Sequence, residues 1–95
     1  MNKAPTPREA AQIQLQYQPG TRLELKLMVD AYAVPPGTRG IVDHVDDMGS
    51  VHIKWDNGRT LAAIPGVDSF RKLTAQELQE ERQGMTAPKM EAQSL

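Results

Sequence analysis

The chain has no cysteine among its 95 residues. This absence excludes both a disulfide framework and a zinc site built on thiolates. Long apolar runs are also absent, since none approaches the roughly 18 residues that a membrane-spanning helix requires. Residues 1–11 carry charged side chains and prolines, without the apolar stretch of a secretory signal peptide. We therefore expect a cytoplasmic protein, in a bacterium or in an infected host cell.

An excess of either charge is lacking as well, because 11 Lys and Arg face 12 Asp and Glu, for a net charge of −1. Residues 19–73 contain equal numbers of acidic and basic side chains, and the acidic excess follows them. Strong non-specific binding of nucleic acid needs clustered cations that neutralise phosphates and release counterions. The charge distribution therefore disfavours such binding.

Signals of catalysis are missing too. The chain has no glycine-rich phosphate loop, and Ser50, Ser69 and Ser94 do not lie in the strand-to-helix elbow that activates a nucleophilic serine. The acidic pair at positions 46 and 47 falls in a turn, on a domain too small for a water-excluding cleft. We therefore expect no enzymatic activity and no cofactor.

What the sequence does contain is a series of short strand patterns, and the first covers residues 21–28. Leu23, Leu25 and Leu27 alternate there with charged side chains, which is typical of a half-buried strand. Residues 29–38 cannot continue it, because two adjacent prolines remove backbone donors and a glycine follows them. This segment is therefore predicted to be a long irregular loop.

The second and third strands are predicted over residues 39–46 and 51–55. Alternation fails near Asp43, and a β-bulge there would restore it. If the intervening turn closes symmetrically, His44 lies opposite His52. Two imidazoles on one outer face are a candidate for a transition-metal site, but a polar cross-strand pair without a metal is the interpretation we prefer.

An Asn-Gly pair at positions 57 and 58 predicts a hairpin, because both residue types tolerate positive φ. Two registers are open. A two-residue loop would turn Leu61 to the outer face, whereas a three-residue loop would pair Trp55 with Arg59 and bury Leu61 against Ile53. The second register is favoured because it buries the leucine.

A tight turn over residues 65–68 and a short strand over 69–73, anchored by Phe70, complete the pattern. Five strands in this order, with the long loop first, predict an all-β fold, a small five-stranded SH3-like β-barrel over residues 19–73.

The flanks are predicted separately. Residues 1–18 are expected to be a flexible arm or a frayed helix. Thr74 and Glu77 form a capping-box pattern, which predicts a short helix over residues 74–84 ended by a glycine. Residues 85–95 lack periodicity and are predicted to be a disordered tail.

Several motifs resemble a family of short bacterial and phage proteins that is known only as a domain of unknown function. The matching stretches are residues 35–40 (PPGTRG), 44–49 (HVDDMG), 52–58 (HIKWDNG) and 64–68 (IPGVD). The resemblance covers about Tyr17 to Leu73 and implies an accessory gene of a phage, plasmid or integrative element, with no assigned activity. A more limited likeness to KOW-type modules begins at Gly40, but acidic residues replace the cationic loops that serve RNA in those modules.

Tyr32 is the most informative candidate contact, since it lies in the long loop where no periodicity requires burial. In SH3-like barrels a groove runs between this loop and the turn before the last strand. The predicted binding residues are Tyr32, Val34, Pro35, Pro36, Pro65 and Val67. The other interpretation is a loop that packs on itself through Tyr32 and Val34.

These observations favour a non-catalytic binding module of a phage or mobile genetic element that docks to a protein partner, such as a host factor or defence enzyme. The alternative is a nucleic-acid-associated accessory protein. Its predicted contacts would be Arg22, Arg39, Lys54 and Arg59.

Overall fold

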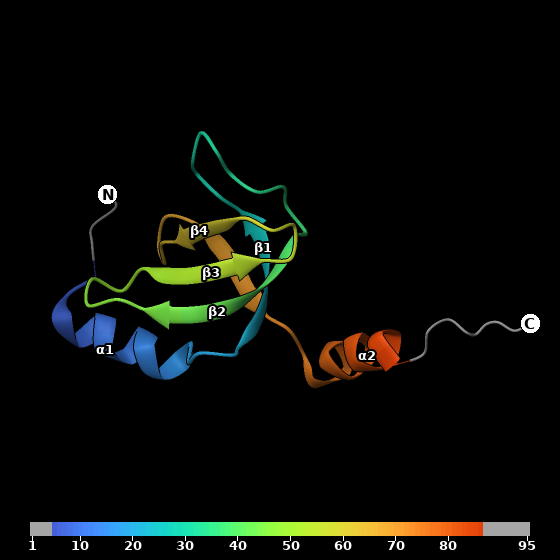
Figure 1. Cartoon of the computed structure of the whole chain (residues 1–95). Helices are drawn as coiled ribbons and strands as arrows, with labels where there is room; N and C mark the ends of the chain where they lie inside the picture. The colour runs from blue at the N-terminus through green and yellow to red at the C-terminus, as the bar shows by residue number, and fades with distance from the viewer. Residues whose placement is uncertain (1–4, 87–95) are drawn as a thin grey trace, which may run out of the picture.

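The computed structural model describes residues 5–86, which form five strands flanked by two helices (Figure 1). The elements are α1 (Pro7–Gln16), β1 (Arg22–Leu27), β2 (Arg39–Val45), β3 (Val51–Trp55), β4 (Thr60–Ala63), β5 (Ser69–Lys72) and α2 (Ala75–Thr86). All five strands belong to one antiparallel sheet, in the order β4-β3-β2-β1-β5. Within the described residues, neither helix has the length and apolar character needed to cross a membrane.

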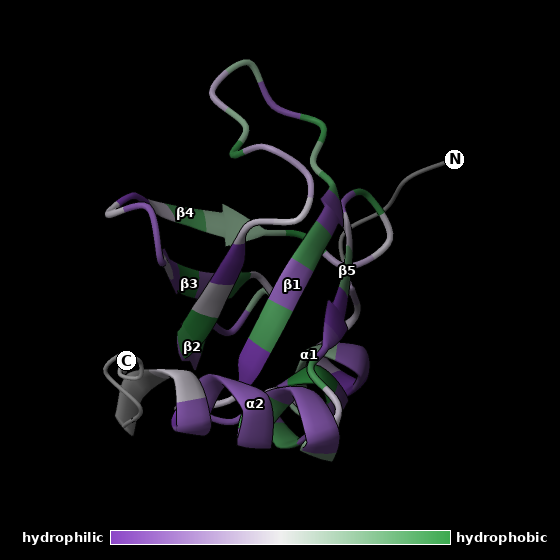
Figure 2. Ribbon diagram, turned by 90° about the vertical axis from the view of Figure 1, so that its right-hand side faces the viewer, coloured by the Kyte–Doolittle hydropathy of each residue, from purple (hydrophilic) through white to green (hydrophobic). Residues whose placement is uncertain are grey.

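The sheet bends until its two edge strands approach each other at one end. A tight turn connects β4 directly to β5, and within it the backbone N–H of Asp68 donates to the carbonyl of Ile64 at 2.8 Å. Figures 1 and 2 show the resulting curvature, with β4 and β5 on opposite sides of a common interior. Within residues 5–86 no ladder joins β4 to β5, and the predicted closure into a barrel is therefore not observed.

One apolar core fills the concave side of the sheet. Val51, Ile53 and Trp55 of β3 pack there with Leu23 and Leu25 of β1, and Phe70 is partly buried at the margin. Leu27, expected to point inward with the other leucines of β1, is 59% exposed. The pairing of β1 with β5 slips between Leu25 and Leu27, and Met28 is buried after this irregularity instead.

Both hairpin registers expected from the sequence are confirmed. The pairing of β2 with β3 shifts between Val42 and His44, as the predicted bulge requires. At the next turn, the N–H of Trp55 donates to the carbonyl of Arg59 at 2.8 Å. Leu61 pairs with Ile53 and packs against the core, which establishes the three-residue loop.

Helix α1 has a capped N-terminus and packs on the sheet. The sequence analysis predicted either a flexible arm or a frayed helix over residues 1–18. Thr6 and Glu9 form a capping box at its start, with backbone-to-side-chain distances of 2.8 and 3.2 Å. Ala10 is buried and Ile13 contacts the core. The side chain of Gln14 also donates to two carbonyls at the end of β2.

Helix α2 begins with the predicted capping box, since the N–H of Glu77 donates to the Thr74 hydroxyl at 3.1 Å and the N–H of Thr74 donates to the Glu77 carboxylate at 2.8 Å. The predicted end at Gly84 is wrong, because the helix continues to Thr86. Gly84 is not among the glycines with positive φ, and it therefore does not act as a left-handed cap. The predicted disordered tail begins inside this helix, and its remainder, residues 87–95, lies outside the described residues.

Candidate docking site

The loop between β1 and β2 carries the predicted contact residue Tyr32 and is fixed by local hydrogen bonds near its tip. The Asp30 carboxylate accepts the N–H of Tyr32 at 2.7 Å, and the Asp30 carbonyl accepts the N–H of Ala33 at 3.2 Å. This is the local turn that aspartate side chains often stabilise. The backbone around Tyr32 is therefore held in one conformation.

The base of the loop is fixed in the same way. The N–H of Leu25 donates to the carbonyl of Thr38 at 2.8 Å, and the N–H of Gly37 donates to the carbonyl of Leu25 at 2.7 Å. The Thr38 hydroxyl closes the turn by donating to the carbonyl of Pro35 at 2.6 Å. Gly37 has φ +90°, a conformation that a residue with a side chain rarely adopts.

Val34 anchors the middle of the loop in the core. Its side chain is only 1% exposed and belongs to the same cluster as Leu23 and Trp55. The sequence analysis placed Val34 among the partner-contacting residues, and that assignment is wrong because a buried side chain cannot reach a partner. Burial of Val34 instead holds the neighbouring Tyr32 in position.

Arg59 ties the loop to the β3–β4 hairpin. Its guanidinium donates to the carbonyl of Tyr32 and, at 3.5 Å, to the carbonyl of Ala33. The sequence offered Arg59 as a nucleic-acid contact, but here its guanidinium binds backbone carbonyls of the loop. Two segments of the chain that lie 26 and 27 residues apart are thereby joined.

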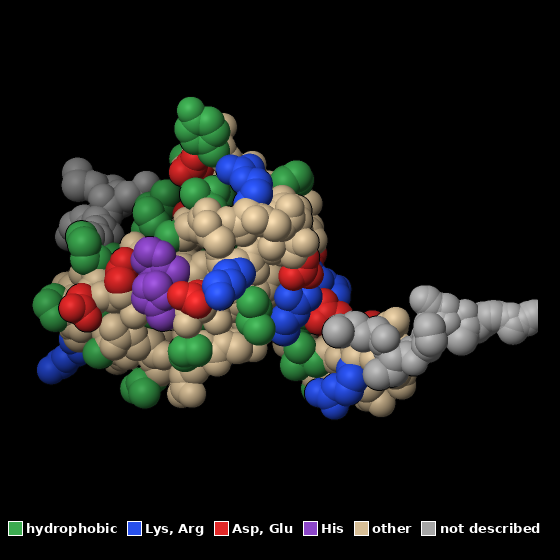
Figure 3. Space-filling model, in the orientation of Figure 1, with side chains coloured by type: hydrophobic (Ala, Val, Ile, Leu, Met, Phe, Trp, Pro, Cys, Tyr) green, Lys and Arg blue, Asp and Glu red, His purple; other side chains and the backbone are tan. Residues whose placement is uncertain are grey.

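The side chain of Tyr32 itself projects away from this fixed backbone and is 74% exposed. Two further apolar side chains on the same segment are also exposed, Leu27 at the end of β1 and Val29 just after it. Figure 3 shows hydrophobic side chains at the tip of the loop that projects above the sheet. The segment 27–36 therefore presents an apolar surface on a restrained backbone.

The β4–β5 turn, predicted to form the other side of the binding groove, is only partly adjacent to this loop. Asp68 links the two, since its carboxylate accepts the N–H of Val29 at 2.7 Å and that of Ile64 at 2.8 Å. Val67 is half-buried. Pro65, however, lines a hollow of about 360 Å³ with residues of α1, among them Ile13. The predicted groove from Tyr32 to Pro65 stays a prediction.

The remaining predicted nucleic-acid contacts lie beside carboxylates. Arg22 forms a two-pronged pair with Asp56, with both distances 2.8 Å, and Lys54 lies 3.5 Å from Asp43. The Arg22 guanidinium lowers the pKa of Asp56 below its usual value. These pairs leave no strongly cationic surface at Arg22 or Lys54, in keeping with the balanced charge of the sequence.

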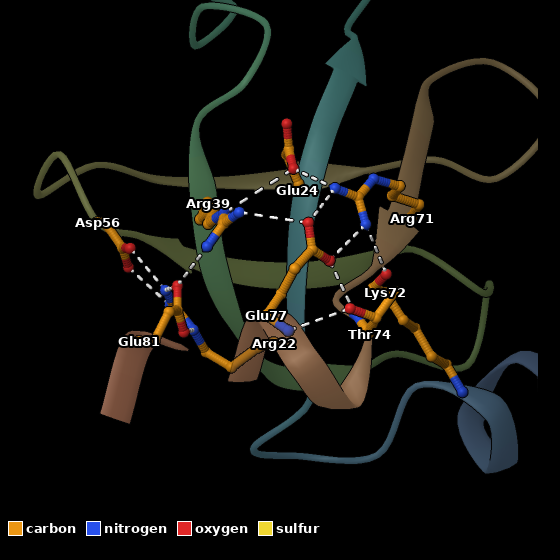
Figure 4. Close-up of polar contacts among 9 residues, drawn as sticks. All are labelled: Arg22, Glu24, Arg39, Asp56, Arg71, Lys72, Thr74, Glu77 and Glu81. Atoms are coloured by element: carbon orange, nitrogen blue, oxygen red, sulfur yellow. Dashed lines mark hydrogen bonds and ion pairs between the residues drawn. The ribbon is translucent and has the colours of Figure 1, made fainter. Parts of the chain in front are cut away.

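Arg22 and Arg39, both predicted as nucleic-acid contacts, lie with Arg71 in a cluster beside α2 (Figure 4), and the sequence analysis did not predict their pairing with this helix. Arg22 and Arg39 both bind Glu81, while Arg39 and Arg71 both bind Glu77. The one available signal was the four-residue spacing of the two glutamates, which places both on the same face of a helix.

His44 and His52 pair across the turn, as the sequence predicted. Their rings are stacked, with centroids 4.3 Å apart and planes inclined by 7°. Each ring binds its own aspartate, Asp43 at 2.6 Å and Asp46 at 2.8 Å. Nitrogen lone pairs lie in the ring planes, and parallel planes cannot direct them to one point between the rings. Within residues 5–86 no group of three or more His, Cys, Asp or Glu is arranged to hold a metal ion.

One family of proteins matches this chain. Its sequence model covers residues 6–73, more than half of the chain, and thus includes α1 and the whole sheet but not α2. The resemblance to a family of unknown function is thereby confirmed, and its start moves from Tyr17 to Thr6. Comparisons with curated proteins and with solved structures gave no match. The chain belongs to the family described as Domain of unknown function (DUF4314).

Proposed function

We propose that the protein is a non-catalytic binding module of a phage or other mobile genetic element, which docks to a protein partner in the cytoplasm through the loop that carries Tyr32. The observation that carries this proposal is an exposed tyrosine on a restrained backbone. Tyr32 is 74% exposed, while its loop is held by the buried side chain of Val34 and by the guanidinium of Arg59.

The restraint of the loop matters because binding must offset the entropy lost when a flexible segment is ordered. A loop that is already fixed loses little further freedom. Tyrosine supplies a rigid apolar ring with a polar tip, and it is enriched among the residues that dominate interface energetics. Leu27 and Val29, on the same segment of the chain, are exposed apolar side chains as well. These features favour a protein surface over a phosphate backbone as the partner.

We also propose that the fold is an SH3-like barrel. The strand order β4-β3-β2-β1-β5 and the tight connection between β4 and β5 support it. In such barrels the loop between the first two strands borders a ligand groove. Pro35, Pro36 and Val67 are the residues that we assign to the rest of this groove.

Capture from a nuclease-treated bacterial lysate tests the proposal. Three immobilised full-length proteins are compared: the natural chain, Tyr32→Ala, and Met48→Ala as the matched control, since Met48 is 66% exposed but lies on the β2–β3 turn. We expect a protein that the natural chain and the control retain and Tyr32→Ala loses, and that binds the purified chain directly.

Two results would contradict the proposal. One is a captured protein that Tyr32→Ala retains in full, since docking would then not involve the loop. The other is a protein that all three samples retain from an untreated lysate and none retains from the nuclease-treated lysate, which would favour the nucleic-acid alternative.

A further inference from the structure

Three arginines from three different strands gather on one side of the sheet (Figure 4). Arg22 comes from β1, Arg39 from β2 and Arg71 from β5. Their side chains are only 20%, 32% and 35% exposed, because carboxylates of α2 lie against them. These arginines define what we call the arginine surface.

Helix α2 meets this surface with two glutamates, four residues apart on one helical face. Glu77 binds Arg71 through both carboxylate oxygens, at 2.8 and 2.7 Å. Glu81 binds Arg22 in the same way, at 2.9 and 2.6 Å, and Arg39 at 3.1 Å. A guanidinium joined to a carboxylate by two hydrogen bonds forms a stronger and more directional pair than a single contact does.

Apolar packing contributes little to the position of α2. Along residues 75–84 the two glutamates are half-buried, and the other residues are exposed. Leu78, between them in sequence, is 36% exposed. It borders an open hollow of about 580 Å³ together with Arg22 and Asp56. Figure 2 shows the helix as largely hydrophilic. In contrast with α1, α2 is therefore held mainly by charge.

The family match separates the two sides of this contact. All three arginines lie within the matched residues 6–73, while both glutamates lie after them. The arginine surface therefore lies within the segment that matches the family model, and the helix that covers it lies outside that segment.

We propose that the arginine surface is a docking site for an acidic helix that carries two carboxylates four residues apart, which α2 occupies in the free protein and which a helix of a protein partner takes over. The site is separate from the loop of Tyr32. Two carboxylates remain among the arginines when α2 leaves, Glu24 at 2.6 Å from Arg71 and Asp56 at 2.8 Å from Arg22. They repel a continuous phosphate backbone, whereas spaced carboxylates on a helix reach the guanidinium groups between them.

Replacement of α2 by a partner is feasible because the ion pairs are partly exposed to water. Such pairs are individually weak and are screened by salt. Two residues, Leu73 and Thr74, connect β5 to α2, and a tether this short gives the helix an effective concentration on the order of millimolar. A partner helix must therefore compete with α2, and removal of the glutamates of α2 should free the surface.

The test uses a fluorescent peptide with the sequence of residues 74–86 and three full-length proteins. These are the natural chain, the double variant Glu77→Gln/Glu81→Gln, and Glu80→Gln as the matched control, since Glu80 is exposed and contacts Gln76 within α2. We expect saturable binding to the double variant, about tenfold or more tighter than to the natural chain or the control, because α2 no longer competes. This binding should disappear in about 1 M salt.

Two further samples establish which groups bind. A peptide with glutamine in place of both glutamates should not bind, and Arg39→Gln in the double variant should abolish binding of the natural peptide. Trp55 fluorescence verifies that each protein is folded, and Arg22→Gln replaces Arg39→Gln if the latter unfolds. The proposal is overturned if the double variant shows no saturable binding at peptide concentrations up to about 1 mM. This limit is on the order of the effective concentration of the tethered helix. Equal affinity of the peptide for the Glu80→Gln control and for the double variant overturns it as well. So does tighter binding of duplex DNA than of the peptide to the double variant.

Discussion

The carboxylate of Asp68 accepts a hydrogen bond from the backbone N–H of Val29, 39 residues earlier in the chain, at 2.7 Å. Its other oxygen accepts the N–H of Ile64 at 2.8 Å. One side chain thus fixes the start of the docking loop to the turn that joins the edge strands of the sheet.

Replacement of Asp68 by alanine should therefore destabilise the fold by about 1–2 kcal/mol, since two backbone donors lose their acceptor. Urea denaturation followed by Trp55 fluorescence measures this change. Asp47→Ala is the control, because Asp47 is exposed in the β2–β3 turn, and it should change stability by about 0.5 kcal/mol or less. Equal stabilities of the two variants would show that Asp68 does not hold these segments together.

Trp55→Ala should cost about 3–5 kcal/mol, enough to unfold a domain of this size. Trp55 is 3% exposed, and its indole N–H donates to the carbonyl of Leu61 at 3.0 Å. Thermal unfolding followed by far-UV circular dichroism is the measurement. A variant that still unfolds cooperatively near the natural melting temperature would place Trp55 outside the core.

Gly40→Ala should destabilise the sheet by about 1–3 kcal/mol through overpacking. A Cβ atom at Gly40 would lie 2.7 Å from the Ile53 side chain and 2.9 Å from the carbonyl of Lys54. Gly84→Ala is the matched control, because the space around Gly84 is open and alanine favours a helix by about 0.5–1 kcal/mol. Denaturation midpoints should fall for the first variant only; a fall of equal size in both would refute the steric explanation.

The contact of α2 with the arginine surface should persist in acid well below the usual titration range of glutamate. Hydrogen bonds from Arg71 and from the backbone of Thr74 lower the pKa of Glu77 from 4.5 to about 2. Because the pKa is lower in the docked state, the stabilisation is present above pH 4.5 and is lost as the pH falls toward about 2. The guanidinium NMR signals of Arg71 report this transition, and Glu77→Gln is the control that lacks it. Release between pH 4 and 5 in the natural chain would contradict the observed contacts.

Alternation and turn chemistry were sufficient to predict most of the sheet. The bounds of β3 agree with the alternation of residues 51–55, and the burial of Leu61 selected the correct hairpin register. The order of α1 was left open by the sequence analysis, although Ala10, Ile13 and Tyr17 have the spacing of one helical face and all three are at least partly buried. The hydrogen bonds from Gln14 to the end of β2 are tertiary contacts, which no local pattern predicts.

The candidate surfaces were less predictable because they depend on contacts between segments far apart in the chain. The exposure of Tyr32 agrees with its place in a loop, but burial of Val34 depends on how that loop folds back on the core. The arginine surface joins residues as far apart as Arg22 and Glu81, 59 positions along the chain. Local patterns place Glu77 and Glu81 on one helical face but do not indicate which residues that face meets.

The most direct test of docking through the loop combines two measurements on Tyr32→Ala. The first is its free energy of unfolding, and the second is its affinity for the protein captured by the natural chain. An exposed side chain contributes little to stability, and we expect a change within about 1 kcal/mol. Partner binding should weaken by at least about 1 kcal/mol, or roughly fivefold in Kd. An unfolded variant, or a folded one with unchanged affinity, would contradict the proposed role of the loop.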